Sequence, residues 1–288
     1  MTITPALLPP PTGTAEPGLL LRLCGPLQSW GERSHFNERD TAPFPTRSGI
    51  VGLLASALGR RRTEPVDDLR RLSLTVRTDR PGVLLRDLHT VGGGLPAKAT
   101  VTTAEGKKRS GDTTTVLTHR TYLADAAFTL ALTLPPATQD LITSEDAGDL
   151  LAQCAEALRC PQWPLYLGRR SCPPEGPVLL GHTDDTLHHL LHLPLAAEPP
   201  GAGTPGIEFL SDRPLDRLPT LNRHVGEDAH PATEVNDEPL SFHPRHRAYR
   251  VRPLYRRTLH LPRLAYAGLG TEQLHITGGY LATHLNRL

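Results

Sequence analysis

The alternation of apolar and polar positions predicts several short strands joined by polar connections. Leu19 to Cys24 is an almost continuous apolar run closed by Gly25-Pro26, as expected of a buried strand. In 72–77 and 128–132, apolar residues occupy every second position, which is the period of a half-buried strand. Further strands are predicted at 83–91 and 178–180.

Two other segments place apolar residues at i, i+3, i+4 and i+7, the spacing of one helix face. The first helix covers 50–58 and ends at Gly59, and the second covers 150–158. Gly49 and Gly52 lower the intrinsic helix propensity of the first helix. Two glycines at a helix start indicate that another group approaches the backbone closely.

The predicted order is strand, helix, strand, insertion, strand, helix, strand. This is the split βαβ arrangement of an α+β, ferredoxin-like core, which RNA-recognition domains also use. Because one fold hosts many functions, the order alone does not define what the protein does.

The remaining segments are predicted to be loops, late strands and tails. The insertion at 92–118 is polar, Thr-rich and basic at its tip, and we interpret it as a protruding β-hairpin arm or a flexible insertion. The segment 182–246 is rich in Pro, Asp and His and is expected to be a variable, mostly irregular loop region. The expected organisation is a disordered N-terminal tail at 1–17, one domain at 18–265 with basic strands at about 248–262, and a C-terminal tail at 266–288.

The net charge is only +1, so a surface coated uniformly by nucleic acid is not expected. The positive charge is instead concentrated locally. From Pro239 to Thr271 there is no acidic residue but there are seven arginines, and shorter basic clusters lie at 60–62, 107–109 and 169–170. This segregation suits one basic groove and a more acidic opposite side. The alternative is a set of solvated faces, which is the preferred interpretation of any single cluster.

No apolar run approaches the roughly 20 residues that span a bilayer, and the N-terminus lacks a secretory pattern. Cys24, Cys154, Cys160 and Cys172 form no CxxC pair, which favours reduced thiols and a cytoplasmic protein without a membrane partner. His188 and His192 have a spacing that can bind a metal on a helix, but no partner motif accompanies them or Asp184-Asp185. A solvated face is the preferred interpretation, and we expect no metal or cofactor.

Two loops are candidates for nucleic-acid contacts. Gly168-Arg169-Arg170-Ser171 combines a glycine, two guanidiniums and a hydroxyl, which can hold a phosphate, although a surface turn stiffened by prolines has the same composition. Gln28-Ser29-Trp30-Gly31 follows the first strand, and its Trp30 can stack on a base or on a protein partner. A tryptophan folded onto the core is the alternative.

General acid–base chemistry is a third candidate. Metal-free RNA cleavage needs a base for the 2′-hydroxyl and an acid for the leaving oxygen, and His89, His119, Tyr122 and Lys107 or Lys108 have suitable side chains. The sequence does not show that these groups meet, and His119-Arg120 serves equally well as a phosphate contact.

Several motifs in register resemble one family of proteins. They are Arg22 to Gly31, Phe44 to Leu54, Leu85 to Val91, Arg120 to Ala126 and Tyr166 to Pro173. Together they resemble the CasD subunits of type I-E CRISPR Cascade complexes, which belong to the Cas5 family. The resemblance covers about 19–180 and, more weakly, the basic C-terminal strands.

The resemblance implies a modified ferredoxin-like (RRM/RAMP-type) core with a protruding β-hairpin thumb. It further implies a non-catalytic subunit that grips the 5′ handle of the crRNA beside the Cascade backbone subunit and the large PAM-recognising subunit. Target DNA is met only through the complex. Relatives in type I-C systems are endoribonucleases, so a metal-independent endoribonuclease remains the alternative, and a protein–protein adaptor is a third hypothesis.

Carried over position by position, the resemblance implies that 92–118 is the thumb and that four blocks line the RNA path. The RNA-binding residues expected from these blocks and from the basic clusters are Gln28, Trp30, Arg47, Ser48, Arg86, His89, Thr90, Lys107, Lys108, His119, Arg120, Tyr122, Gly168, Arg169, Arg170 and Ser171.

Overall fold

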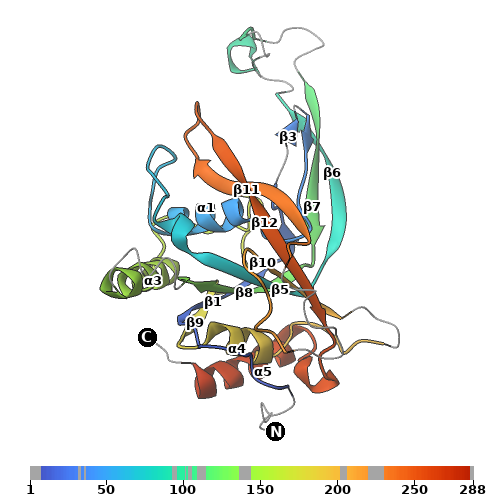
Figure 1. The fold of residues 1–288 in the computed structure, drawn as a ribbon. Coiled ribbons are helices and arrows are strands. Elements are labelled where there is room, and N and C mark those ends of the chain that lie inside the picture. Colours follow the sequence, from blue (N-terminus) through green and yellow to red (C-terminus); the bar gives the residue numbers. More distant parts are fainter. Residues whose placement is uncertain are drawn as a thin grey trace.

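The protein has a mixed α and β fold dominated by antiparallel sheet (Figure 1). The computed structural model describes residues 8–31, 34–35, 37–92, 96–100, 102, 106–108, 115–135, 144–201, 206–219 and 230–285. Within these residues, a seven-stranded sheet has the order β11-β12-β10-β5-β8-β1-β9. Its strands are β1 Gly18–Cys24, β5 Ser73–Arg80, β8 Ala127–Thr133, β9 Leu179–Thr183, β10 Ile207–Ser211, β11 Thr233–Ser241 and β12 Ala248–Leu259.

β1 lies between β8 and β9 and pairs antiparallel with both. β5 pairs antiparallel with β8 on one side and with β10 on the other. The strands predicted at 19–24, 72–77, 128–132 and 178–180 are therefore confirmed, as is a late basic strand, which is β12.

A second sheet stands beside the first. It contains β2 Leu27–Gln28, β3 Ser34–His35, β4 Glu38–Arg39, β6 Val83–Val91 and β7 Val116–Ala124. β6 and β7 pair in continuous antiparallel register from Val83↔Ala124 to Val91↔Val116 and form a ribbon that rises away from the main sheet (Figure 1). The paired strands lie largely outside the arm predicted at 92–118. Much of 92–115 falls outside the described residues, apart from short pieces such as the 3-10 turn η2 Ala97–Ala99.

Helices cover both faces of the main sheet. α1 Arg47–Ala57 and α3 Ser144–Arg159 lie on one face, and α4 Thr186–His192 and α5 Gly270–His284 lie on the other (Figure 1). The 3-10 turns η1 Leu69–Arg71 and η4 Arg263–Ala265 precede β5 and α5. Both predicted helices are confirmed, and Thr46 caps α1 by accepting a hydrogen bond from the Gly49 N–H.

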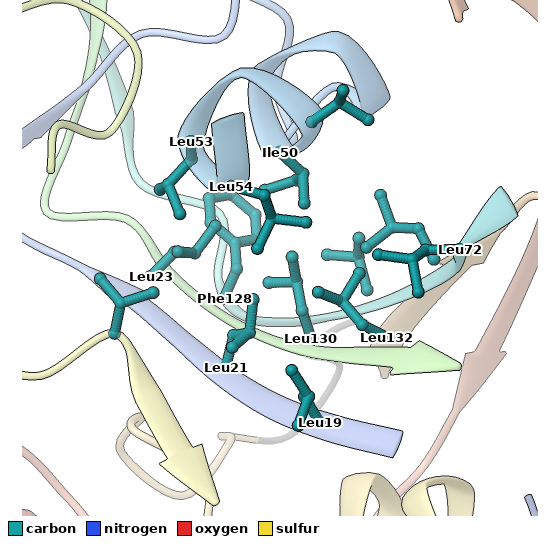
Figure 2. Close-up of a cluster of buried hydrophobic side chains, with 14 of the residues drawn as sticks. Leu19, Leu21, Leu23, Ile50, Leu53, Leu54, Leu72, Phe128, Leu130 and Leu132 are labelled. Carbon is teal, nitrogen blue, oxygen red and sulfur yellow. The ribbon is translucent and has the colours of Figure 1, made fainter. Parts of the chain in front are cut away.

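The core on the α1 side explains why the apolar positions recur with these periods. The side chains of Ile50, Leu53 and Leu54 point from α1 toward the sheet, as Figure 2 shows. The sheet meets them with alternate residues of β1 and β8, namely Leu19, Leu21, Leu23, Phe128, Leu130 and Leu132. Each of these side chains is nearly inaccessible, so each contributes about 1.5–3 kcal/mol of transfer free energy.

The opposite face has its own apolar layer, in which Leu20 and Ala131 of the sheet pack with Leu190 and Leu191 of α4. The fully buried Arg77 of β5 ties α4 to the sheet. Its guanidinium pairs with Asp79 and donates hydrogen bonds to the carbonyls of Leu190 and Leu193 at 2.7 and 2.6 Å. The buried charge of Arg77 is therefore paired with a carboxylate, and its guanidinium N–H groups donate to nearby acceptors.

Two predictions about the tails were wrong, and a third missed ordered elements. The region 182–246, expected to be mostly irregular, contains α4, β10 and β11, and the expected tail at 266–288 contains α5. Within the expected N-terminal tail, residues 8–17 are docked: the Thr12 N–H donates to the carbonyl of Arg217 at 2.8 Å, and Glu16 pairs with Arg213 at 2.6 Å. Residues 1–7 lie outside the described residues.

Candidate nucleic-acid interface

A groove of about 750 Å³ lies over α1. The β11–β12 connection, residues 163–170 and the end of β4 also line it. Its lining includes Arg39, Asp40, Ser48, Gly49, Gly52, Arg60, Arg61, Arg62, Trp163, Tyr166, Gly168, Arg169, Arg170, Phe242, Arg247 and Tyr249. We refer to it as the arginine groove.

Positive charge dominates the arginine groove. Asp40 is the one carboxylate among the described residues that line it. Arg60 is neutralised by Asp68, and their hydrogen bonds hold the pKa of the Asp68 carboxyl below its usual range. Five further arginines are exposed and have no recorded side-chain partner within the described part of the chain: Arg39, Arg61, Arg62, Arg170 and Arg247. Unpaired guanidiniums facing one groove favour an anionic occupant.

α1 contributes mostly small residues to the groove lining, from Ser48 to Ser56. A Cβ added to Gly49 would lie 2.7 Å from the Trp30 ring, and one added to Gly52 would lie 3.8 Å from Phe242. The close approach predicted from these glycines is therefore made in part by the buried Trp30. Ser48 is half-buried at the start of the helix and lines the groove.

Gln28 and Trp30 form a buried pair beside α1. The Trp30 indole N–H donates to Gln28 Oε1 at 3.0 Å, and the Gln28 amide donates to the carbonyls of Leu23 and Ala126. Trp30 is only 1% exposed and Gln28 is inaccessible. Neither side chain can reach an RNA base in this structure, so we leave both out of the proposed interface.

Arg47 is also turned inward. Its guanidinium pairs with Asp212 and donates to the carbonyl of Arg70 at 2.6 Å, while its backbone N–H donates to Asp237 at 2.7 Å. It joins α1 to β11 and to the loop after β10 and is not available to a phosphate.

In the Gly168–Ser171 loop, Gly168 and Arg169 hold the local fold, whereas the next two residues are accessible. Arg169 donates to the backbone carbonyls of Thr121, Arg39 and Asp40 at 2.8–2.9 Å, and its guanidinium lies 4.7 Å from the centre of the Tyr122 ring. Gly168 has φ +94°, and a Cβ there would lie 1.7 Å from the carbonyl oxygen of Ser29. By contrast, Arg170 is exposed and lines the groove, whereas Ser171 is exposed but is not part of the groove lining.

The expected site residues of the β6–β7 ribbon are divided between its two faces. The register places Arg86, Thr90 and His119 on one face, where Glu38 accepts from Arg86 at 3.2 Å and lies 3.1 Å from His119 Nδ1. His89, Arg120 and Tyr122 lie on the other face. Tyr122 is buried beneath Arg169, with its hydroxyl 3.4 Å from Ser171 Oγ.

Lys107 and Lys108 lie near the end of the ribbon and do not line the groove. Both are exposed, and the Lys108 ammonium donates to the carbonyl of Thr100 at 3.0 Å. The structure therefore brings Ser48, Gly168, Arg169 and Arg170 together at the groove but leaves the lysines apart from them.

Sequence reasoning missed several lining residues. Arg61 and Arg62 were recognised as a basic cluster, and Arg247 as part of the acid-free segment, but none was assigned to the site. Trp163 and Tyr249, which are 43% and 36% exposed, were not singled out. Trp163 could have been identified from the sequence, because it is an aromatic residue between two prolines shortly before the Gly-Arg-Arg-Ser loop.

The thiols and histidines outside the groove do not form a reactive centre in the described residues. Burial raises the pKa of Cys154 to about 12 and that of Cys24 to about 11, so both remain protonated. Asp185 caps α4 by accepting from the His188 N–H, and no group of three candidate metal ligands is found among the residues described. No helix within the described ranges is long and apolar enough to cross a membrane.

Comparisons with known proteins place these features in a family. Residues 18–255 match the model of "CRISPR-associated protein (Cas_Cas5)". The chain is 38% identical over 175 residues to the CRISPR system Cascade subunit CasD of Escherichia coli (strain K12), covering 57% of this chain and 70% of that protein.

Two solved structures give the same result. A chain of a CRISPR RNA-guided surveillance complex matches with a TM-score of 0.73 and 38% identity, over 92% of this chain and 99% of that one. A Cas protein crystal structure matches with a TM-score of 0.56 and 33% identity, over 88% and 99% of the two chains. The chain therefore belongs to the Cas5 family of CRISPR-associated proteins.

Proposed function

We propose that this chain is the CasD-type subunit of a type I-E Cascade complex in the cytoplasm, where it binds the 5′ handle of the crRNA without cutting it. The observation that carries the proposal is the arginine groove, in which exposed guanidiniums surround exposed aromatic rings. Arginines contact phosphates and aromatic rings stack on bases, so this composition suits RNA. The identity to a Cascade subunit and the similarity to a surveillance-complex chain support it.

We further infer that the core is a modified ferredoxin-like, RAMP-type fold. The chain order β1-α1-β5, then β8-α3-β9, and the sheet order β9-β1-β8-β5 support this inference. These are the order and connectivity of a split βαβ unit. The β6–β7 ribbon, inserted between β5 and β8, is then the thumb.

The thumb is the proposed contact to neighbouring subunits of the complex. One face of the ribbon carries the exposed side chains of Leu84, Leu88 and Leu117, which are 54–65% exposed. A row of exposed leucines on a protruding ribbon is unfavourable in water and suits burial against another protein. The backbone subunit and the large PAM-recognising subunit are the proposed partners, and target DNA would be met only through them.

The endoribonuclease alternative has weaker geometric support. His119 and Tyr122 lie on opposite faces of the ribbon, and Tyr122 is buried under Arg169. His89 shares the face of Tyr122 but pairs with Thr118, several residues along the strand. A general base and a general acid must both reach one scissile phosphate, and these side chains do not converge.

The test is to incubate the full chain with labelled repeat-derived RNA in the presence of EDTA and to follow binding and cleavage together. We expect saturable binding that weakens steeply as salt rises, because each neutralised phosphate releases counterions, and an intact RNA. Specific cleavage would favour the endoribonuclease. Binding that is absent, or insensitive to salt, would favour the adaptor hypothesis.

A further inference from the structure

Trp163 is an exposed aromatic ring in the wall of the arginine groove. The chain has two tryptophans, and Trp30 is buried, whereas Trp163 is 43% exposed. The lining of the same groove also includes Arg61 and Arg62. An indole this exposed is accessible to a ligand that stacks on its ring.

The backbone around Trp163 is held firmly against α1. The Gln162 N–H donates to the carbonyl of Ala57 at 2.9 Å. Gly59, just after α1, has φ +73°, and a Cβ there would lie 2.7 Å from Gln162 Cγ. The loop carrying Trp163 is therefore joined to the end of α1, just before the segment that carries Arg61 and Arg62, and all three residues line the groove.

We propose that Trp163 is a stacking platform for an unpaired base and that Arg61 and Arg62 hold the adjoining phosphates, so that the groove takes single-stranded RNA. This inference rests on the proposed function and adds the residue on which a base of that RNA stacks. An unpaired base offers its face to an indole, whereas the bases inside a duplex are stacked on each other.

The surroundings of Trp163 favour RNA over a docked protein. An apolar partner would desolvate the unpaired guanidiniums of Arg61 and Arg62 without replacing their hydration. A nucleotide covers the ring with its base and at the same time offers phosphate oxygens to the guanidiniums. One ligand thus satisfies both features of the groove.

The fluorescence of Trp163 tests the proposal directly, because Trp30 is shielded. The full chain is titrated with a short single-stranded RNA and with a blunt duplex of the same sequence. We expect quenching by the single strand and little quenching by the duplex. Trp163→Phe should abolish the quenching but bind within about threefold of wild type, since a smaller ring still stacks.

Removing the ring and removing the charge should have different signatures. Trp163→Ala should weaken single-strand binding about tenfold and leave the salt slope unchanged, because no charge is lost. Arg61→Ala with Arg62→Ala should lower that slope by about 1.4 but keep the quenching at saturation. Leu264→Ala, which removes a 64% exposed side chain outside the groove lining, is the control and should change neither quantity.

The outcomes separate this inference from the proposed function. If wild type binds RNA tightly without quenching and Trp163→Ala binds equally well, the stacking role is overturned while RNA binding stands. If wild type binds no RNA, both fail together. If Trp163→Ala binds RNA normally but no longer co-purifies with the partner subunits, Trp163 is a protein contact and the inference is wrong.

Discussion

Arg169 and Arg170 are adjacent in sequence but have different environments. Arg169 supplies donors to three backbone carbonyls, so Arg169→Ala leaves these acceptors without partners and should lower the free energy of unfolding by about 2 kcal/mol. Arg170→Ala should change it by less than about 0.5 kcal/mol but lower the salt slope of RNA binding by about 0.7. Denaturant titration and RNA binding at several salt concentrations measure the two effects. Equal stability of both variants would contradict the assignment.

Two features require glycine at position 168: a positive φ angle and close contact with the Ser29 carbonyl. At φ +94°, its added Cβ would overlap the Ser29 carbonyl, so Gly168→Ala should displace the loop and lower stability by at least about 2 kcal/mol. Gly176→Ala is the matched control, because a Cβ there meets no atom within 4 Å, and we expect a change below about 1 kcal/mol. A thermal unfolding series compares them, and a fully stable Gly168→Ala would refute the close contact.

The buried position of Trp30 shows why individual site residues were harder to predict than elements. Its neighbours in sequence left an exposed ring and a ring folded onto the core as alternatives, and the ring packs against Gly49 on α1, where no Cβ intervenes. The residue that buries Trp30 is thus 19 positions away in sequence. Arg47 was misjudged for the same reason, since its acceptors Asp212 and Asp237 come from much later in the chain.

The elements with a clear period were predicted well, and those without one were not. β1, α1, β5, β8 and α3 carry continuous apolar faces and were all recovered, although α3 begins six residues before the predicted start at 150. β11 was not predicted, because its sequence contains Asp237, Glu238 and Pro239. Both acids are paired: Arg252 binds Asp237 at 2.6 Å, and Arg70 and Arg250 bind Glu238. Tertiary ion pairs thus permit a strand that local composition disfavours.

The contact between α4 and α5 predicts acid sensitivity. His189 Nδ1 lies 2.9 Å from the Tyr280 hydroxyl, and His188, His192 and His284 surround this contact. Burial, and then the neighbouring histidines, lower the pKa of His189 to about 4, although Asp185 opposes the effect. Because the folded pKa lies below the unfolded value of about 6.5, the folded state binds fewer protons. The contribution of His189 to the free energy of unfolding is therefore fully present above pH 6.5 and is lost as pH falls from 6.5 toward 4.

A comparison of unfolding midpoints between pH 7 and pH 5 measures this decline. His189→Gln cannot gain the proton, so its midpoint should fall less over the same range than that of wild type. Most carboxylates titrate below this window and affect both proteins alike. If the two midpoints decline in parallel, protonation of His189 does not govern the stability of the α4–α5 contact.

The charge of the protein is unevenly distributed, which determines how RNA affinity should respond to mutation. With a net charge of +1, the average field gives little attraction for a polyanion. The exposed arginines of the groove are instead gathered from β4, from the segment after α1, from the loop after α3 and from the β11–β12 connection. The groove should therefore bind RNA through its local positive charge. The position of an arginine should affect RNA affinity more than the net charge of the protein does.

Two double variants with equal charge test this placement. Arg61→Ala with Arg62→Ala removes two groove arginines, and Arg159→Ala with Arg256→Ala removes two that pair with Glu156 and Glu208 outside the groove lining. Each pair takes the net charge from +1 to −1. The groove pair should lower the slope of log affinity against log salt by about 1.4, because two phosphate contacts are lost, and the other pair should leave it unchanged. Binding curves over a series of salt concentrations distinguish the two. An equal loss in both variants would mean that RNA responds to the overall charge of the protein, and the arginine groove would then not be its binding site.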